Sequence, residues 1–206
     1  MNKPNLYVVA APSGGGKTSL INALLKADDT ASLSISHTPR APRPAEENGI
    51  HYHFVDDEQF QALIAQNSFL EHARVFDHSY GTSREFVEQR LAAGLNIILD
   101  IDWQGARQIR ENFPACCSIF ILPPSLEVLR MRLARRGQDS SEIINRRMQA
   151  ARNEISHWEE FDFLIINDDF DQALGDLQSI FRYGHLKREV PQDRYEYLLA
   201  ELLKNG

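Results

Sequence analysis

LYVVAAPSGGGKT, residues 6–18, predicts a buried β-strand, a tight turn and the start of a helix. Residues 6–11 form a short, nearly continuous apolar run, which is typical of a strand covered on both faces of its sheet. A glycine-rich turn follows directly, and a helix-like stretch then runs from Lys17 to Lys26. A strand, a tight loop and a helix in this order indicate the beginning of a βαβ unit.

The turn is close to the phosphate-binding motif G-x-x-x-x-G-K-[ST] and differs from it only in that alanine replaces the first glycine. Glycines let successive backbone N–H groups curl around a phosphate at the N-terminus of a helix. Lys17 would supply a mobile positive charge to the outer phosphates, and the Thr18 hydroxyl would be a ligand for Mg²⁺. The expected phosphate loop consists of Ala11, Pro12, Ser13, Gly14, Gly15, Gly16, Lys17 and Thr18.

Three further apolar segments predict additional strands, at residues 96–102, 118–122 and 163–167. Such segments alternate with helical stretches, which indicates an α/β fold with a parallel sheet and helices on both faces. Asp100 and Asp102 stand at the end of the first of these strands. A strand-end carboxylate beside a phosphate loop is a candidate for binding the metal or the substrate.

Two segments interrupt this alternation. The first, from about residue 34 to 94, contains prolines, short alternating runs and two capping boxes, at residues 56–59 and, with Thr82 as the cap, at residues 82–85. We expect a small α+β insertion there. The second, residues 126–160, predicts two helices and carries seven arginines against two acidic residues between positions 130 and 152.

Two amphipathic helices are expected after the last strand, and both are predicted to pack on a core. The apolar positions of the first are Leu174, Leu177 and Phe181, and those of the second are Tyr195, Leu198, Leu199 and Leu202.

Composition limits the classes of function. The chain of 206 residues is 43% hydrophobic and has 22 basic against 29 acidic residues, a net charge of −7. An acidic protein is a poor candidate for binding nucleic acid or anionic membranes. Two adjacent cysteines, Cys116 and Cys117, cannot build a disulfide framework, and no apolar run approaches the ~20 residues of a membrane span. We expect a soluble cytoplasmic protein.

Several further segments together resemble those of the guanylate kinases. They are the phosphate loop, SHTPRAPR at 36–43, NGIHYHF at 48–54, FLE at 69–71, YGT at 80–82, LDIDWQG at 99–105, RLARRG at 132–137 and INDD at 166–169. The order and spacing of these segments make the resemblance specific, and it covers nearly the whole chain. It implies transfer of the ATP γ-phosphate to GMP, and with it ATP and GMP as the partners of the protein, dGMP as a further acceptor and Mg²⁺ as the cofactor.

The resemblance also implies a role for each matching residue. The GMP phosphate would be held by Arg40, Arg43, Tyr52 and Tyr80, and guanine would be read by Ser36, Glu71, Thr82 and Asp100, with Asp102 nearby. Gly81 would be a further GMP-binding residue. Arg132, Arg136 and Arg147 would close over the transferring group as lid arginines, and Asn167 would contact adenine. Lys17, Arg43 and the three lid arginines would be catalytic, and Thr18, with Asp100 as a second candidate, would bind Mg²⁺.

The same resemblance implies three parts. Residues 1–34, 95–125 and 161–206 would form the phosphate-loop core, residues 35–94 the GMP-binding insertion, and residues 126–160 the lid.

Elementary chemistry agrees with these roles. A carboxylate such as Glu71 accepts hydrogen bonds from both N1–H and the 2-amine of guanine, and adenine would leave it unpaired. The guanidinium forks of Arg40 and Arg43 match phosphate oxygens, and Arg132 and Arg136, four residues apart on one helix face, repel each other until a polyphosphate binds.

Two alternative functions remain at this stage. One is a kinase of the same fold that acts on a phosphorylated sugar, and the other is a non-catalytic interaction domain that resembles guanylate kinase. The sequence does not determine an oligomeric state.

Overall fold

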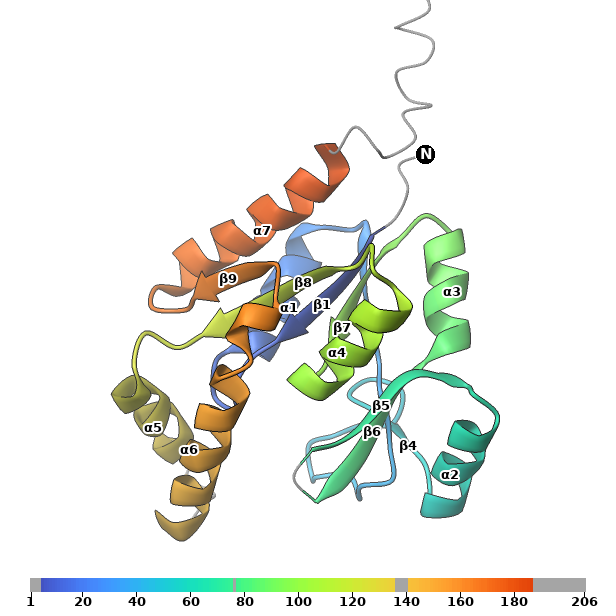
Figure 1. Ribbon diagram of the computed structural model, residues 1–206, viewed down its shortest axis with the longest axis horizontal. Coiled ribbons are helices and arrows are strands. Elements are labelled where there is room, and N and C mark those ends of the chain that lie inside the picture. The colour runs from blue at the N-terminus through green and yellow to red at the C-terminus, as the bar shows by residue number, and fades with distance from the viewer. Residues whose placement is uncertain (1–4, 76, 136–140, 187–206) are drawn as a thin grey trace, which may run out of the picture.

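A five-stranded parallel β-sheet forms the centre of the structure (Figure 1). The structure is a computed structural model, and it describes residues 5–75, 77–135 and 141–186. In order across the sheet, the strands are β2 (Ala31–Ser34), β7 (Asn96–Asp100), β1 (Leu6–Ala10), β8 (Cys117–Leu122) and β9 (Phe163–Ile166). The predicted α/β class and parallel sheet are confirmed.

All five residues of the central strand β1 are buried, which explains why its sequence is a nearly continuous apolar run. Strand β2 was not predicted. It lies at the edge of the sheet, and three of its four residues are only partly buried, so its sequence lacks a continuous apolar run. The strand predicted at residues 96–102 ends at Asp100, because Asp102 instead caps the helix that follows.

Helices cover both faces of the sheet. On one face, α1 (Lys17–Ala27) and α7 (Phe170–Leu186) share a core cluster with the sheet, and the aromatic rings of Tyr7 and Phe181 stack with centroids 3.7 Å apart. On the other face, α3 (Arg84–Ala92) and α4 (Trp103–Asn112) pack on β1 and β7 through Val87, Ala106 and Ile109. The apolar stripe predicted at residues 174–181 is confirmed, and the helix predicted at residues 195–202 lies outside the described residues.

The insertion has a sheet of its own. Its order is β4 (His53–Phe54), β3 (His37–Thr38), β6 (His78–Ser83) and β5 (Phe69–Val75), flanked by α2 (Asp57–Ala65). The capping box predicted at Asp56 and Gln59 is confirmed. At the second capping box the prediction was wrong by one residue, because the Ser83 side chain caps α3 and Thr82 makes a different hydrogen bond. Helix α3, although it follows this insertion sheet directly, packs on the core.

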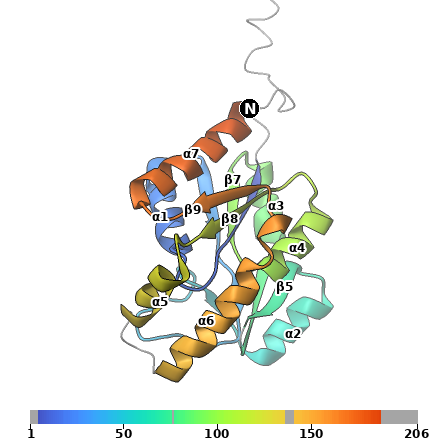
Figure 2. The same cartoon turned by 60° about the vertical axis from the view of Figure 1, so that its left-hand side comes forward.

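Helices α5 (Leu126–Arg135) and α6 (Ser141–Ile155) form a third unit, held together by Leu129, Leu133, Met148 and Ala151. The short helix η1 (Trp158–Glu160) joins this unit to β9. Figures 1 and 2 show the α5–α6 unit and the insertion on two sides of the same end of the main sheet. No helix in the part of the chain that the structure describes is both long enough and apolar enough to cross a bilayer.

The stack of Tyr7 on Phe181 leads to a first prediction. Phe181→Ala removes a fully buried ring and leaves a cavity, so it should lower the free energy of unfolding by about 3–5 kcal/mol in urea titrations. Tyr183→Ala in the same helix is the control, because Tyr183 is exposed, and it should cost less than about 1 kcal/mol. Equal losses from the two variants would contradict this account of the core.

Candidate active site

The phosphate loop follows β1 and opens α1, which is the structural context that its motif requires. Gly14 and Gly16 have φ values of +90° and +95°, a region that residues with a Cβ rarely occupy. A turn hydrogen bond of 2.8 Å joins Gly15 N–H to the Pro12 carbonyl. The loop therefore has the curled backbone needed to direct N–H groups at an anion.

Lys17 and Thr18 meet the end of the neighbouring strand. Strands β1 and β7 pair with Val9 opposite Asp100, so the two strands end side by side. Lys17 Nζ lies 2.5 Å from Asp100 Oδ1 and donates a hydrogen bond of 2.8 Å to the Ile101 carbonyl. The Thr18 hydroxyl donates a weaker bond of 3.4 Å to Asp100 Oδ2.

Asp102 has a structural contact on each of its carboxylate oxygens. Oδ1 accepts the backbone N–H of Gly105 at 2.9 Å and so caps α4, and Oδ2 accepts the side-chain amide of Gln104 at 3.0 Å. Asp102 therefore fixes the first turn of α4. That turn places Gly105 against the Glu71 carboxylate of the insertion.

A cavity of about 320 Å³ lies beside the phosphate loop. The Asn167 amide donates to the Gly15 carbonyl at 2.8 Å, and a Cβ at Gly16 would collide with that amide. Arg132 donates through one guanidinium nitrogen to the Asn167 backbone carbonyl at 2.9 Å. Its other terminal nitrogen is buried with no hydrogen-bond partner among the described residues, which suits it to bind an anion. The lining residues are Gly14, Gly16, Ser19, Arg132, Asn167, Asp168 and Phe170.

Glu71 is the most unusual acidic residue of the insertion, because only 3% of it is exposed. The Thr82 hydroxyl donates to its Oε1 at 2.5 Å, and Gly105 lies so close to Oε2 that a Cβ there would overlap it. Burial raises the pKa of this carboxyl from 4.5 to about 7, against the opposing effect of the Thr82 hydrogen bond. Buried Ser36 is a second hydroxyl of the same insertion.

The Thr82 contact changes one expectation. A hydroxyl has a single proton, and the proton of Thr82 is directed to Glu71 rather than to an oxygen of a ligand. Ser36 and Thr82 are the two hydroxyls among the residues that the resemblance assigns to guanine, and the Thr82 proton is already used by Glu71. Gly81, next to Thr82, packs beneath the Phe69 ring, which a Cβ would approach to 2.8 Å.

Arg40, Tyr52 and Tyr80, which the resemblance assigns to the GMP phosphate, lie together in the structure. The Arg40 guanidinium lies 5.3 Å from the Tyr52 ring, and the rings of Tyr52 and Tyr80 are 5.7 Å apart. Burial, together with the smaller effects of Tyr80 and Asp100, raises the pKa of Tyr52 to about 12. The influence of Asp100 connects this cluster with the strand end that Lys17 contacts.

Glu46 is a residue of this cluster that the sequence did not reveal. Both of its carboxylate oxygens accept one guanidinium nitrogen of Arg40 at 2.9 Å, and one of them accepts the Arg43 backbone N–H at 2.8 Å. The Arg43 side chain itself is exposed. No sequence pattern around Glu46 predicts this contact, because it forms only when the proline-rich loop folds back toward Arg40.

The α5–α6 unit contributes Arg132 from α5 and Arg147, which is half-buried, from α6. The third predicted lid arginine, Arg136, lies outside the described residues. A second residue that the sequence did not reveal is Glu154 in the last turn of α6, which accepts the Ser13 backbone N–H of the phosphate loop at 3.0 Å.

Taken together, these residues form a cationic loop that suits a nucleotide polyphosphate and a buried carboxylate that suits a donor-rich base. The end of β7 lies between them. Comparison with known proteins agrees with this arrangement. The family model described as guanylate kinase matches residues 3–183. The chain belongs to the guanylate kinase family.

Individual relatives agree over nearly the full length. The guanylate kinase of Alkalilimnicola ehrlichii is 58% identical over 200 residues, which are 97% of each chain. The guanylate kinase of Photobacterium profundum is 56% identical and is matched over 98% of this chain and 99% of its own. Among solved structures, the guanylate kinase of Anaplasma phagocytophilum superposes with a TM-score of 0.77 at 33% identity, covering 100% of this chain and 96% of the other. The family inferred from the sequence is confirmed.

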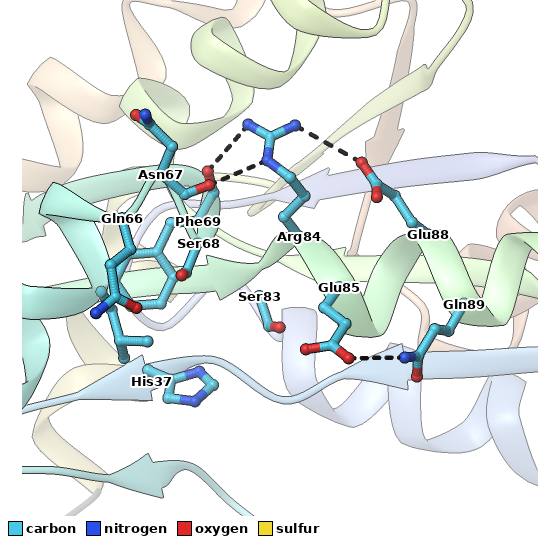
Figure 3. A pocket seen from close by; sticks show the side chains of 11 residues that line it. His37, Gln66, Asn67, Ser68, Phe69, Ser83, Arg84, Glu85, Glu88 and Gln89 are labelled. Carbon is cyan, nitrogen blue, oxygen red and sulfur yellow. Dashed lines mark hydrogen bonds and ion pairs between the residues drawn. The ribbon is translucent and has the colours of Figure 1, made fainter.

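A larger cavity of about 500 Å³ lies elsewhere in this member of the guanylate kinase family, and its lining contains none of the residues predicted for nucleotide binding (Figure 3). It lies between α2, β5 and α3. Arg84 spans its upper side, donating to the carbonyls of Asn67 and Phe69 at 3.2 Å and pairing with Glu88 at 3.7 Å. Arg84, the first residue of α3, therefore links this helix to the insertion through hydrogen bonds.

The raised pKa of Glu71 gives a second prediction. The folded state holds a proton on Glu71 between pH 4.5 and about 7 that the unfolded state releases, so this residue lowers stability as pH rises through that range. Glu71→Gln abolishes the effect. In urea unfolding, the stability of the variant relative to the parent should increase from pH 5 to pH 8, by about 3 kcal/mol at most.

Glu58→Gln on the exposed surface of α2 is the matched control and should show no such trend. A difference between Glu71→Gln and the parent that is the same at pH 5 and pH 8 would show that Glu71 is ionised throughout.

Proposed function

We propose that this chain transfers the γ-phosphoryl group of ATP to GMP, giving ADP and GDP, and that it also accepts dGMP. The observation that carries the proposal is the buried Glu71 carboxylate, which is held by Thr82 and lies against Gly105. A buried carboxylate costs stability, and that cost is explained if the group binds a ligand. Family membership supports the same reaction.

Guanine fits this carboxylate for a chemical reason. Its N1–H and 2-amine are parallel donors on one edge of the base, and two carboxylate oxygens accept both at once. The Ser36 hydroxyl would donate to O6. Adenine has neither of these donors, so its binding would forgo both hydrogen bonds that guanine makes and leave Glu71 Oε2 facing a base that offers it no donor, at a cost that excludes adenine.

The GMP phosphate would bind to Arg40, Arg43, Tyr52 and Tyr80. Arg40 Nε is buried and has no hydrogen-bond partner within the described part of the chain, so it has a donor available. The Glu46 carboxylate accepts from the Arg40 guanidinium in the way that phosphate oxygens would. Glu46 thereby keeps the arginine buried and oriented before the substrate arrives.

The reaction needs positioning and charge neutralisation rather than a general base, because the acceptor oxygen of GMP is already anionic near neutral pH. Lys17, the loop N–H groups, Arg132, Arg147 and, by the family pattern, Arg136 would stabilise charge on the transferring group. Asn167 would contact adenine in the cavity beside the loop.

Mg²⁺ fits the residues at the strand end. The Thr18 hydroxyl and the Asp100 carboxylate bring two hard oxygen donors together, and such oxygens are the ligands that Mg²⁺ prefers. Thr18 would hold the ion directly together with the nucleotide phosphates, with Asp100 as a second ligand. When bound, Mg²⁺ supplies positive charge that neutralises the phosphate oxygens. We place this activity in purine nucleotide metabolism in the cytoplasm, where nucleotides are abundant and thiols such as that of Cys116 stay reduced.

The third prediction concerns the acceptor. In a coupled assay of ADP release with ATP and Mg²⁺, GMP and dGMP should be phosphorylated, with kcat/KM for GMP exceeding that for AMP by roughly 10⁴-fold. UMP and CMP should react as poorly as AMP. Turnover of AMP that equals or exceeds that of GMP would contradict the proposal. A protein that fails to bind ATP with Mg²⁺ in calorimetry would instead be an interaction domain.

The same assay on Glu71→Gln directly tests whether the buried Glu71 carboxylate binds the acceptor base. The glutamine amide presents one donor where guanine requires an acceptor, so kcat/KM for GMP should fall by about two orders of magnitude or more. Glu58→Gln should leave it unchanged. If Glu71→Gln retained full activity with the preferred acceptor, the acceptor would not be guanine, and a phosphorylated sugar would be the next candidate.

The fourth prediction uses Gly105. Gly105→Ala places a methyl group where it overlaps Glu71 Oε2, so the carboxylate must move away from the base. We expect KM for GMP to rise about tenfold or more while KM for ATP changes little. Gly175→Ala in α7 is the control, because a Cβ at Gly175 meets nothing within 4 Å. An unchanged KM for GMP would place the base away from Gly105.

A further inference from the structure

A carboxylate in contact with an anion-binding loop needs an explanation. Glu154 Oε2 accepts the Ser13 backbone N–H at 3.0 Å, in a loop whose other N–H groups and Lys17 attract negative charge. Burial raises the pKa of Glu154, whereas the Ser13 bond and the nearby Lys17 lower it. The contact is therefore a specific link between the end of α6 and the phosphate loop, across 141 residues of sequence.

The loop backbone is supported by two side chains from outside it. Asn167 donates to the Gly15 carbonyl, and Glu154 accepts from Ser13 N–H, so a donor and an acceptor fix the two sides of the glycine turn. Gly14, between these contacts, has no side chain to restrict it. A glycine turn loses much conformational entropy when it is ordered, so supports that order it beforehand reduce the cost of binding.

The end of α6 that carries Glu154 is fixed a second time. His157 stacks on Trp103 with ring centroids 3.5 Å apart, and its Nδ1 lies 2.8 Å from Glu160, which also pairs with Arg107. Figures 1 and 2 show that this C-terminal end of α6 lies nearest the main sheet, while the rest of the helix extends away beside α5. The end of α6 is thus an anchor for the α5–α6 unit.

Arg147 lies on the same helix as this anchor. It precedes Glu154 by seven residues, which is two helical turns or about 10 Å, so both belong to one face of α6. Met148 and Ala151 instead pack on Leu129 and Leu133 of α5. Where the Glu154 end of the helix sits therefore determines where Arg147 is presented.

We propose that Glu154 is a positioning residue of the phosphoryl transfer, which holds the phosphate loop through Ser13 N–H and links it to the helix that carries Arg147. This role rests on the proposed function, because it assigns ATP to the loop. The opposite role, a carboxylate that occupies a phosphate site and must be displaced, would make removal of Glu154 strengthen ATP binding.

The test compares Glu154→Leu, Glu154→Gln and Glu154→Asp with the parent. Leucine has no acceptor, and aspartate is one methylene too short to keep the contact in place. Both variants should weaken ATP binding in calorimetry roughly tenfold and lower kcat by a similar factor, with KM for GMP changed less than about twofold. Glutamine retains a carbonyl acceptor and should restore both values to within about threefold of the parent.

Glu159→Leu, at an exposed position of η1, is the matched control and should bind ATP as the parent does. The inference is overturned if Glu154→Leu and Glu154→Asp bind ATP as the parent does, if ATP binds them more tightly, or if Glu154→Gln is as impaired as Glu154→Leu. Thermal unfolding of each variant identifies one that does not fold, and Glu154→Asp then carries the comparison. ATP binding is measured without GMP, so a protein that failed to phosphorylate GMP would refute the proposed function and still test Glu154.

Discussion

The parallel pairing of β1 with β7 is the constraint on which the site depends. It places Asp100 opposite Val9, so that the end of β7 meets the loop that follows β1. Lys17 then reaches Asp100 and the Ile101 carbonyl, while Asp102, two residues further, caps α4 and brings Gly105 to Glu71. One strand end thus sets the distance between the cationic loop and the buried Glu71 carboxylate.

Buried charge is concentrated where a ligand would explain it. Burial in the insertion raises the pKa of the Glu71 carboxyl. Arg40 is also buried, and the Glu46 carboxylate compensates its charge. In Arg132 and Arg40, a buried nitrogen lacks a hydrogen-bond partner among the described residues. Apolar replacements at these positions would pack at lower cost, so the arrangement favours binding over stability. The core beneath contains fully buried apolar and aromatic side chains on both faces of the sheet.

Much of the fold and part of the site follow from local patterns. The apolar runs at β1, β7, β8 and β9 and the glycine loop were sufficient for the α/β class, and the resemblance gave the family. The edge strand β2 lacked such a run, and the cap of α3 moved from Thr82 to Ser83 because the Thr82 hydroxyl bonds to Glu71. Glu46 and Glu154 carried no signal, since each acts through a contact that is made only when distant segments meet.

Local sequence patterns already indicate which chemistry is present: a phosphate loop with its lysine and threonine, strand-end aspartates, and arginines in a proline-bearing segment. Residue type and short-range spacing suffice for this, because the loop and its helix are built from neighbouring residues. Which polar groups are buried together becomes clear only from the folded arrangement. The hydrogen bond between Glu154 and Ser13 depends on packing of segments 141 residues apart, and the one between Glu71 and Thr82 depends on the register of β5 against β6.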